Sequence, residues 1–410
     1  MIRTASSIAA ILLFACACAP GNEYEIRVDA SALEDQASRA VAYGYLPGKD
    51  DYGELASAEL QNGRATLSGV VDYVRIFQID VLPADDIYPL GRAEFVLEPG
   101  LTTVRFLADS NEVEGGHYTR FAFDSWRGDP EYSAADEERR ARFDAMAAMS
   151  EEEREEREAS RVEWSEMTIE SKREALKPGL IQSRILREIY TTHEDPVVRF
   201  VALSADQGWI AKWDLQEDSK AGRSMGFLEQ IGFYESLEQE LPGNPVVAAA
   251  ADRIRDGYER YLTASSIAIG TEIRDFGAVS LDGEPFRLTE VLNDNEYVLV
   301  EFWASWCGPC RAEIPHMKEA YEKYHGMGFE IVSVSLDEEH EDWQEASIEE
   351  QIPWIDVGDQ QGFDSESAKL YGVQGIPANY LAKGGSGEIV GTHLRQRKLD
   401  DKLAELYGGE

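Results

Sequence analysis

The residues best suited to chemistry are two cysteines separated by two residues, Cys307 and Cys310. They follow the apolar run VLVEFW, which predicts a buried strand, and they precede a predicted helix from Ala312 to Tyr324. Free backbone N–H groups and the macrodipole at a helix N-terminus favour a thiolate, so we predict that Cys307 is the nucleophile. Cys310 would lie in the first turn, close enough to form a disulfide and to resolve a mixed disulfide. This arrangement predicts thiol-disulfide exchange.

A single C-x-x-C motif can instead be half of a metal site. Zinc takes four nitrogen or sulfur ligands, yet the sequence has no second C-x-x-C motif, and its six histidines form no H-x₃₋₅-H group. We therefore predict no metal site, and no cofactor beyond the redox-active disulfide of Cys307 and Cys310. The alternative is an envelope partner-binding or copper-carrying protein that uses the same cysteine pair. Soft thiolates suit Cu(I), but copper carriage requires a further ligand that the sequence does not place.

Strand and helix patterns alternate around the cysteines, from residue 268 to residue 410, as a βαβ fold requires. The segment FGAVSLDGEPFRL predicts a hairpin, VLVEFW a central strand and FEIVSVSLD a second buried strand. A last helix is predicted from Leu399 to Tyr407. Glu301 is the only charged residue within VLVEFW. Packing alone does not explain an acidic residue in so apolar a strand. These patterns predict a C-terminal α/β domain.

The first part of the chain predicts an all-β domain. Residues 21–127 alternate apolar and polar residues in short runs such as YEIRV and VRIFQI, which is typical of half-buried strands. Asn62-Gly63 and the 98–100 segment EPG lie between such runs and predict hairpin turns. We therefore expect a small sandwich-like domain.

The middle of the chain, residues 131–265, loses this alternation and predicts a mostly helical domain. Asp195-Pro196 and Asn244-Pro245 each place an N-cap residue before a proline at the first helical position. The fold class expected for the whole chain is therefore multidomain, with β, helical and α/β domains in that order.

The segment FWASWCGPC resembles the thioredoxin superfamily, and its surroundings resemble the membrane-anchored branch of the TlpA/ResA type. The similarity extends over about residues 268–410 and includes the lead-in GTEIRDFGAVSLDGEPFRL. It implies a thioredoxin-like fold and a thiol-disulfide oxidoreductase, whereas a peroxiredoxin is disfavoured because its peroxidatic cysteine does not lie in a WCGPC segment. The run SAELQNGRATLSG also resembles the β-domain that precedes thioredoxin modules in many Gram-negative envelope lipoproteins.

This resemblance implies how a substrate would be held. Gly308-Pro309 matches the dipeptide of reducing thioredoxins. Ile376-Pro377, in GVQGIPA, matches the loop whose cis-proline faces the cysteines and aligns the substrate backbone; the alternative is an ordinary turn proline. Trp306 is expected to shield the sulfur and to contact the partner protein, whereas Trp303 is expected in the core.

Two acidic residues also correspond to positions in the family. Glu301 stands where thioredoxins keep a buried Asp beneath the resolving cysteine, and a buried carboxyl with a raised pKa can accept the proton of Cys310. Glu313 matches an acidic position that is frequent in the TlpA/ResA branch, which implies a modulating role. Its alternative is a first-turn glutamate that the helix dipole favours.

The N-terminus predicts export and a lipid anchor. Ile2-Arg3 and the short apolar run IAAILLF predict a secretion signal, since the run is too short to span a bilayer. The segment LFAC resembles a bacterial lipobox, so we expect residues 1–18 to hold the signal peptide and the lipidation site, Cys16. Cys18 is also spaced for lipidation, and ordinary cleavage after Ala19 would leave Pro20 unfavourably behind the cut. The protein is therefore expected in the cell envelope, facing the periplasm.

Composition limits the possible partners. The 410 residues exceed what one hydrophobic core usually supports, and a hydrophobic content of 43% argues against wholesale disorder. Asp and Glu outnumber Lys and Arg by 78 to 39, and a net charge of −39 repels a phosphate backbone, so nucleic acid is not expected to bind. The expected partners are disulfide-bonded proteins of the envelope, a membrane electron donor that re-reduces the cysteines, and the membrane itself through the lipid.

Overall fold

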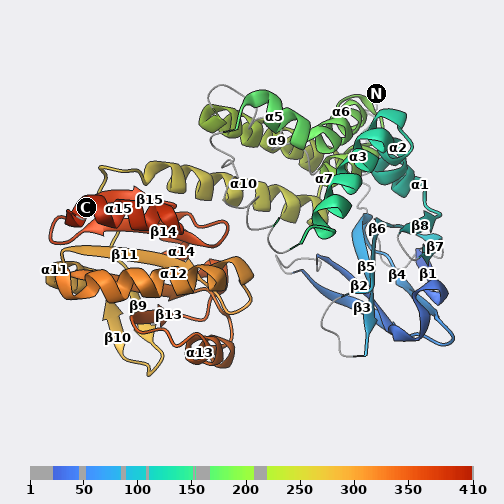
Figure 1. Cartoon of the computed structure of the whole chain (residues 1–410). Helices are drawn as coiled ribbons and strands as arrows, with labels where there is room; N and C mark the ends of the chain where they lie inside the picture. Colours follow the sequence, from blue (N-terminus) through green and yellow to red (C-terminus); the bar gives the residue numbers. More distant parts are fainter. Residues whose placement is uncertain are drawn as a thin grey trace, which may run out of the picture. The chain divides into compact units, whose positions relative to one another are not determined.

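The computed structural model describes residues 22–45, 52–84, 89–107, 110–150, 153, 167–206 and 219–408. The chain divides into two compact units, Met1–Arg253 and Ile254–Glu410 (Figure 1). The predicted signal peptide and the lipidation site Cys16 lie outside the described residues. No helix of the described residues is both long and apolar enough to cross a membrane.

The first unit begins with two four-stranded β-sheets, with the strand orders β4-β1-β7-β8 and β3-β2-β5-β6. β1 pairs antiparallel with β4 and parallel with β7, whereas the second sheet is antiparallel throughout. Inward-facing residues of both sheets, such as Ile26 and Phe95, share one core, so the sheets pack face to face. The strands are β1 (Glu23–Asp29), β2 (Ala37–Tyr45), β3 (Tyr52–Glu59), β4 (Arg64–Val70), β5 (Arg75–Pro83), β6 (Gly91–Leu97), β7 (Gly100–Phe106) and β8 (Asn111–Glu114), with a 3-10 helix at Ser31–Gln36.

Neither of the two predicted turns in this region joins two paired strands of one sheet. Asn62 and Gly63 have φ of 54° and 73° and reverse the chain between Gln61 and Arg64, as expected for this dipeptide, but they join β3 to β4 in the other sheet. The 98–100 segment likewise joins β6 to β7 across the two sheets. Turn residues set the local reversal, whereas the burial of each strand's apolar face sets which sheet it joins.

Helices follow β8 in the first unit. Two predicted N-caps are confirmed, because Asp195 accepts a hydrogen bond from the N–H of Val197 at 2.8 Å and Asn244 accepts one from Val246 at 3.0 Å. The helices are α1 (His117–Thr119), a π-helical turn (Arg120–Asp124), α2 (Ser125–Arg127), α3 (Pro130–Ala147), α5 (Ile169–Ala175), α6 (Lys177–Thr192), α7 (Pro196–Ala205), α9 (Ser219–Glu240) and α10 (Pro245–Ser266).

The sheets and helices of the first unit are joined at Glu98. Its buried carboxylate accepts hydrogen bonds from the N–H groups of His117 and Tyr118, at 2.7 and 2.9 Å, at the start of the helical segment. The Thr119 hydroxyl accepts a further bond, from Val96 N–H of β6, at 3.0 Å. The β and helical regions therefore contact each other within the first unit, and the second unit begins at Ile254, within α10.

The second unit is a seven-stranded mixed sheet with the order β10-β9-β13-β12-β11-β14-β15. The predicted hairpin is present, since β10 pairs antiparallel with β9. β11 lies between parallel β12 and antiparallel β14 and is buried along its whole length. The strands are β9 (Gly277–Ser280), β10 (Pro285–Arg287), β11 (Tyr297–Trp303), β12 (Phe329–Ser335), β13 (Ile355–Gly358), β14 (Ala378–Lys383) and β15 (Ile389–Thr392).

Two cores cover the two faces of this sheet. Val298, Val300 and Phe302 of β11 belong to one core, with residues of α11 and α14. Leu299 and Trp303 point to the other face and pack with both cysteines, α12, α13 and α15. The helices are α11 (Leu288–Asp294), α12 (Gly308–Tyr324), α13 (His340–Glu349), α14 (Glu366–Tyr371) and α15 (Arg397–Tyr407), with 3-10 helices at His325–Met327 and Gly362–Asp364.

Candidate active site

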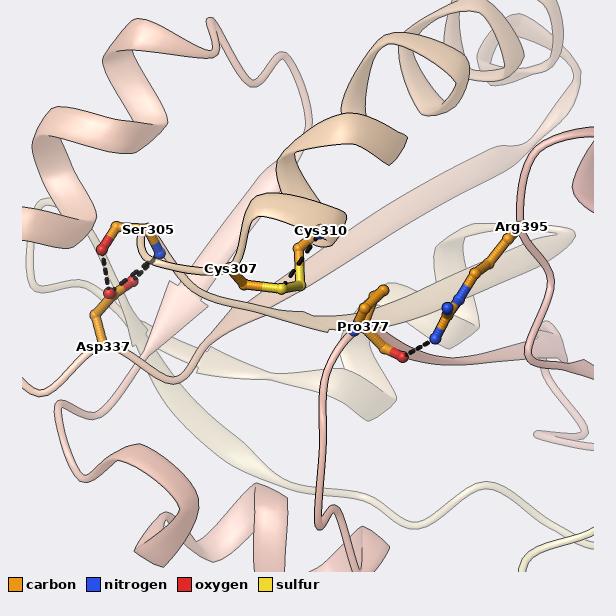
Figure 2. The surroundings of a disulfide bond; sticks show 6 residues. All are labelled: Ser305, Cys307, Cys310, Asp337, Pro377 and Arg395. Carbon is orange, nitrogen blue, oxygen red and sulfur yellow. Dashed lines mark hydrogen bonds between the residues drawn. A yellow bond between two sulfur atoms is a disulfide. The ribbon is translucent and has the colours of Figure 1, made fainter. Parts of the chain in front are cut away.

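Cys307 and Cys310 lie where β11 ends and α12 begins, and a disulfide joins them (Figure 2). Cys307 is the N-cap of α12, and its Sγ accepts a hydrogen bond from the N–H of Cys310 at 3.2 Å. The helix begins at Gly308, earlier than the predicted Ala312, because Cys307 caps it and Pro309 fits its first turn. In the reduced form, this N–H and the helix dipole would stabilise a thiolate at Cys307.

The sulfurs are largely covered, while the side chain beside them is exposed. Cys307 is 4% exposed and Cys310 2%, whereas Trp306 is 60% exposed. The Trp306 ring packs against Phe363, with 6.2 Å between the ring centroids. The indole is thus an exposed apolar surface beside the disulfide.

Asp337 fixes the loop that leads into the cysteines. Its carboxylate accepts bonds from the Ser305 N–H, at 3.1 and 3.0 Å, and from the Ser305 hydroxyl, at 2.6 Å (Figure 2). Ser335, the last residue of β12, donates a further bond to it at 2.8 Å. Asp337 thus ties the chain before Cys307 to the end of the neighbouring parallel strand.

The loop before β14 faces the disulfide (Figure 2). The Ile376–Pro377 peptide bond is cis, and the Pro377 carbonyl accepts a hydrogen bond from Nη2 of Arg395 at 2.5 Å. Pro377 is buried, and Ile376 packs against both cores of the unit. Asn379 binds both backbone groups of Leu394, at 2.6 and 2.7 Å, so the segment that carries Arg395 is fixed to this loop.

Glu301 lies on the same face of β11 as Leu299 and Trp303, because side chains alternate along a strand. Its carboxyl is therefore on the side of the sheet that packs against the cysteines and α12. It is 3% exposed, and its Oε2 atom has no hydrogen-bond partner among the described residues. Burial raises the pKa of Glu301 to about 8, although a hydrogen bond from Asn379 and the positive charge of Arg395 oppose this rise.

Glu313, on the second turn of α12, is also buried. Its Oε2 atom accepts a hydrogen bond from the N–H of Gln396 at 3.0 Å, and its charge contributes to the raised pKa of Glu301. Glu313 thus connects α12 to the segment that also contains Arg395. A glutamate that only stabilised the helix dipole from the first turn would not make this connection.

Trp303 lies in the core. Its indole N–H donates to Asp356 at 3.1 Å, and Trp343 donates to the same carboxylate at 2.9 Å. Burial raises the pKa of Asp356 to about 6. No cluster of three or more His, Cys, Asp or Glu side chains in the described part of the chain could hold a metal ion.

Residues 269–385 match the model of the AhpC/TSA family. Tryparedoxin from Trypanosoma brucei brucei is 38% identical over 106 residues, which are 25% of this chain and 72% of that protein. Thiol-disulfide oxidoreductase ResA from Oceanobacillus iheyensis is 31% identical over 167 residues, 39% of this chain and 81% of that protein. The chain belongs to the thioredoxin-like thiol-disulfide oxidoreductases.

This thiol-disulfide oxidoreductase is also similar to solved structures. The thioredoxin domain of a thiol-disulfide oxidoreductase from Bacteroides vulgatus is 29% identical and covers 34% of this chain and 98% of its own, with a TM-score of 0.32. A thiol-disulfide oxidoreductase from Bacteroides fragilis is 30% identical and covers 33% of this chain and 99% of its own, also with a TM-score of 0.32. The family model lies wholly within the second unit, which is an α/β thioredoxin-like domain.

Sequence reasoning missed Asp337 and Arg395. A signal existed for Asp337, since it lies two residues after the end of a buried strand, and the carboxyl ends of parallel strands meet at one edge of a sheet. No comparable signal existed for Arg395, because its contact with Pro377 depends on how β14, β15 and the chain beyond them fold together.

Proposed function

We propose that this thiol-disulfide oxidoreductase works outside the cytoplasm and reduces disulfides of cell-envelope proteins. The Cys307 thiolate attacks a substrate disulfide, forms a mixed disulfide and releases one substrate thiolate. The Cys310 thiolate then attacks the Cys307 sulfur, which forms the intramolecular disulfide and releases the second substrate thiolate. Two electrons pass to the substrate, and a membrane electron donor returns two to the cysteines.

The observation that carries this proposal is the position of the disulfide. It caps α12, next to the exposed Trp306 and opposite the loop with the cis-bonded Pro377 (Figure 2). A helix N-terminus lowers the pKa of a cysteine, which suits Cys307 to the attack. A substrate backbone aligned along Ile376 and Pro377 would present its disulfide to that sulfur.

Glu301 is proposed to carry the proton of the second step. A carboxyl with a pKa of about 8 exchanges protons readily near neutral pH, and its raised pKa is close to that of an ordinary thiol. Its ionised form can accept the Cys310 proton as that thiol becomes the attacking thiolate. Its neutral form then returns the proton when the cysteines are re-reduced. Glu313 is proposed to modulate this exchange, since its charge favours the neutral form of Glu301.

The location is proposed from the N-terminal residues. The predicted secretion signal and the lipobox cysteine, Cys16, support a lipid anchor in an envelope membrane. The anchor would hold the domain near a membrane electron donor.

Trapping tests the assignment of the two sulfurs. In Cys310→Ser the first step is intact and the second is not, so covalent complexes with envelope proteins should accumulate and should dissolve in reducing agent. The matched Cys307→Ser variant should form none and should lack reductase activity. Equal residual activity in both variants, or complexes only in Cys307→Ser, would contradict the proposal.

A further inference from the structure

A cluster of positive residues lies in this acidic chain, next to the active site. The segment HLRQRK, residues 393–398, contains His393, Arg395, Arg397 and Lys398, whereas the whole chain carries a net charge of −39. We call it the basic loop. Partial burial lowers the pKa of His393, and the charges of Arg395 and Lys398 lower it further, so these groups lie within electrostatic range of one another. At neutral pH the positive charge of the loop therefore comes from its arginines and its lysine.

Five hydrogen bonds hold the basic loop against the active site. Arg395 donates to the carbonyl of Pro377, and the N–H of Gln396 donates to Glu313 of α12. The remaining three join His393 and Leu394 to Asn379, two residues after Pro377. The loop is thus fixed to both the helix and the loop that flank the disulfide, and a polypeptide that lies along Pro377 must pass close to it.

Helix stability does not explain these cations. Arg397 and Lys398 are the first two residues of α15, where the positive end of the helix dipole disfavours positive charge. Arg397 is 91% exposed, and its only salt bridge among the described residues, to Asp401 at 3.5 Å, is with a side chain that is 70% exposed. That pair also has the less favourable order for an i,i+4 ion pair, with the cation first. The charge of Arg397 opposes the helix that it begins, so its placement calls for a role outside that helix.

We propose that the basic loop docks an acidic segment that flanks the disulfide of the partner protein. This inference rests on the proposed reductase function and specifies the class of partner. Because the rest of the chain is strongly acidic, an acidic segment is repelled elsewhere and attracted at the edge of the active site, which orients its disulfide towards Cys307. A basic segment would be attracted to the remaining surface and repelled at this loop.

Paired peptide substrates test this inference. One peptide carries a disulfide flanked by Asp and Glu, and the other carries the same disulfide flanked by Asn and Gln. The pre-reduced full chain is mixed with each in a stopped-flow instrument, and the ratio of the two second-order rate constants is the readout. For the native protein at low salt we expect the acidic peptide to react about tenfold faster, and the ratio should approach one at ~1 M salt, where the Debye length is ~3 Å.

Variants assign the effect to the loop. The double variant Arg397→Glu/Lys398→Glu should lower the low-salt ratio below one, and the milder Arg397→Gln/Lys398→Gln should bring it near one. Arg287→Glu is the matched control, since Arg287 is 57% exposed on β10, at the far edge of the sheet from β15. It should keep the native ratio. A native ratio of one, or equal ratios in the native protein and the loop variants, would overturn the docking inference, whereas failure to reduce either peptide would overturn the reductase function itself.

Discussion

Replacing Glu301 by Gln should change how the stability of the thioredoxin-like domain depends on pH. The pKa of this carboxyl rises from an ordinary 4.5 to about 8 in the folded chain, mainly through burial. The folded protein therefore binds this proton more tightly than the unfolded chain does. Its contribution to stability is fully present below pH 4.5 and is lost as the pH rises to about 8.

The size of the effect follows from the two pKa values. At 1.36 kcal/mol for each pH unit between them, ionising the buried carboxyl costs at most about 5 kcal/mol. Gln has nearly the same shape and no ionisation, so it removes this dependence. The free energy of unfolding of Glu301→Gln, relative to the native protein, should therefore increase by about 1.4 kcal/mol per pH unit between pH 5 and pH 8.

The assay is urea unfolding of the oxidised full chain at several pH values. Hydrogen exchange of peptides from β11, read by mass spectrometry, assigns the transition to this domain rather than to the first unit. Glu319→Gln, which removes an exposed carboxylate from α12, is the control and should leave the pH dependence unchanged. A difference between Glu301→Gln and the native protein that stays constant from pH 5 to pH 8 would refute the argument that Glu301 is buried with a raised pKa.

Four further predictions concern kinetics and anchoring. In Glu301→Gln, stopped-flow reduction of a model disulfide should keep its first phase and slow its second, most near neutral pH; an unchanged second phase would make Glu301 a structural residue. Arg395→Ala removes a positive charge that lowers the pKa of Glu301, so the pH profile of the second phase should move to higher pH. If Arg395 has a purely structural role, the variant should instead lower all rates and leave the shape of the pH profile unchanged. Asp337→Asn weakens the charge-assisted hydrogen bonds from Ser305, so we expect the free energy of unfolding to fall by about 1–3 kcal/mol and Cys307 to attack the substrate more slowly. A variant with native stability in urea unfolding would contradict this prediction. Mature protein should partition into detergent, and Cys16→Ala should abolish this unless Cys18 is lipidated instead; partitioning that survives loss of both cysteines would contradict lipidation.

Much of the thioredoxin-like domain could be predicted because its signals are local. The apolar run of β11 is long enough to be a strand buried on both faces, and the C-x-x-C after it marks the start of α12. The Asp195 and Asn244 caps could be predicted for the same reason, since an N-cap bond joins residues two or three apart. The sequence signals for the two turns in the β-rich region were also local, and these residues do reverse the chain.

The sequence could not predict which strands those turns join, because pairing depends on the burial of whole faces. Nor could the sequence predict that Glu98, at one of these turns, caps the first helical segment and so joins the β and helical regions. A turn glutamate usually faces solvent, and only the distant His117 and Tyr118 give it a buried role. The same limit applies to Arg395, whose partner Pro377 lies on another loop.

In the proposed reaction, different groups stabilise the thiolate of Cys307 and accept the proton of Cys310. In the proposed reaction, the thiolate of Cys307 would be stabilised by the N-terminus of α12, a fixed dipole that requires no proton transfer from the strand below. In the proposed second step, removal of the Cys310 proton would need a base, and Glu301 is the acidic residue of β11 on the side of the cysteines. Arg395 connects these functions, because it binds the carbonyl of Pro377 and lowers the pKa of Glu301. An acidic partner that docks at the basic loop would offset the charge of Arg395 and raise the pKa of Glu301, so the pH profile of the second step should move to higher pH for an acidic partner, in the same direction as in Arg395→Ala.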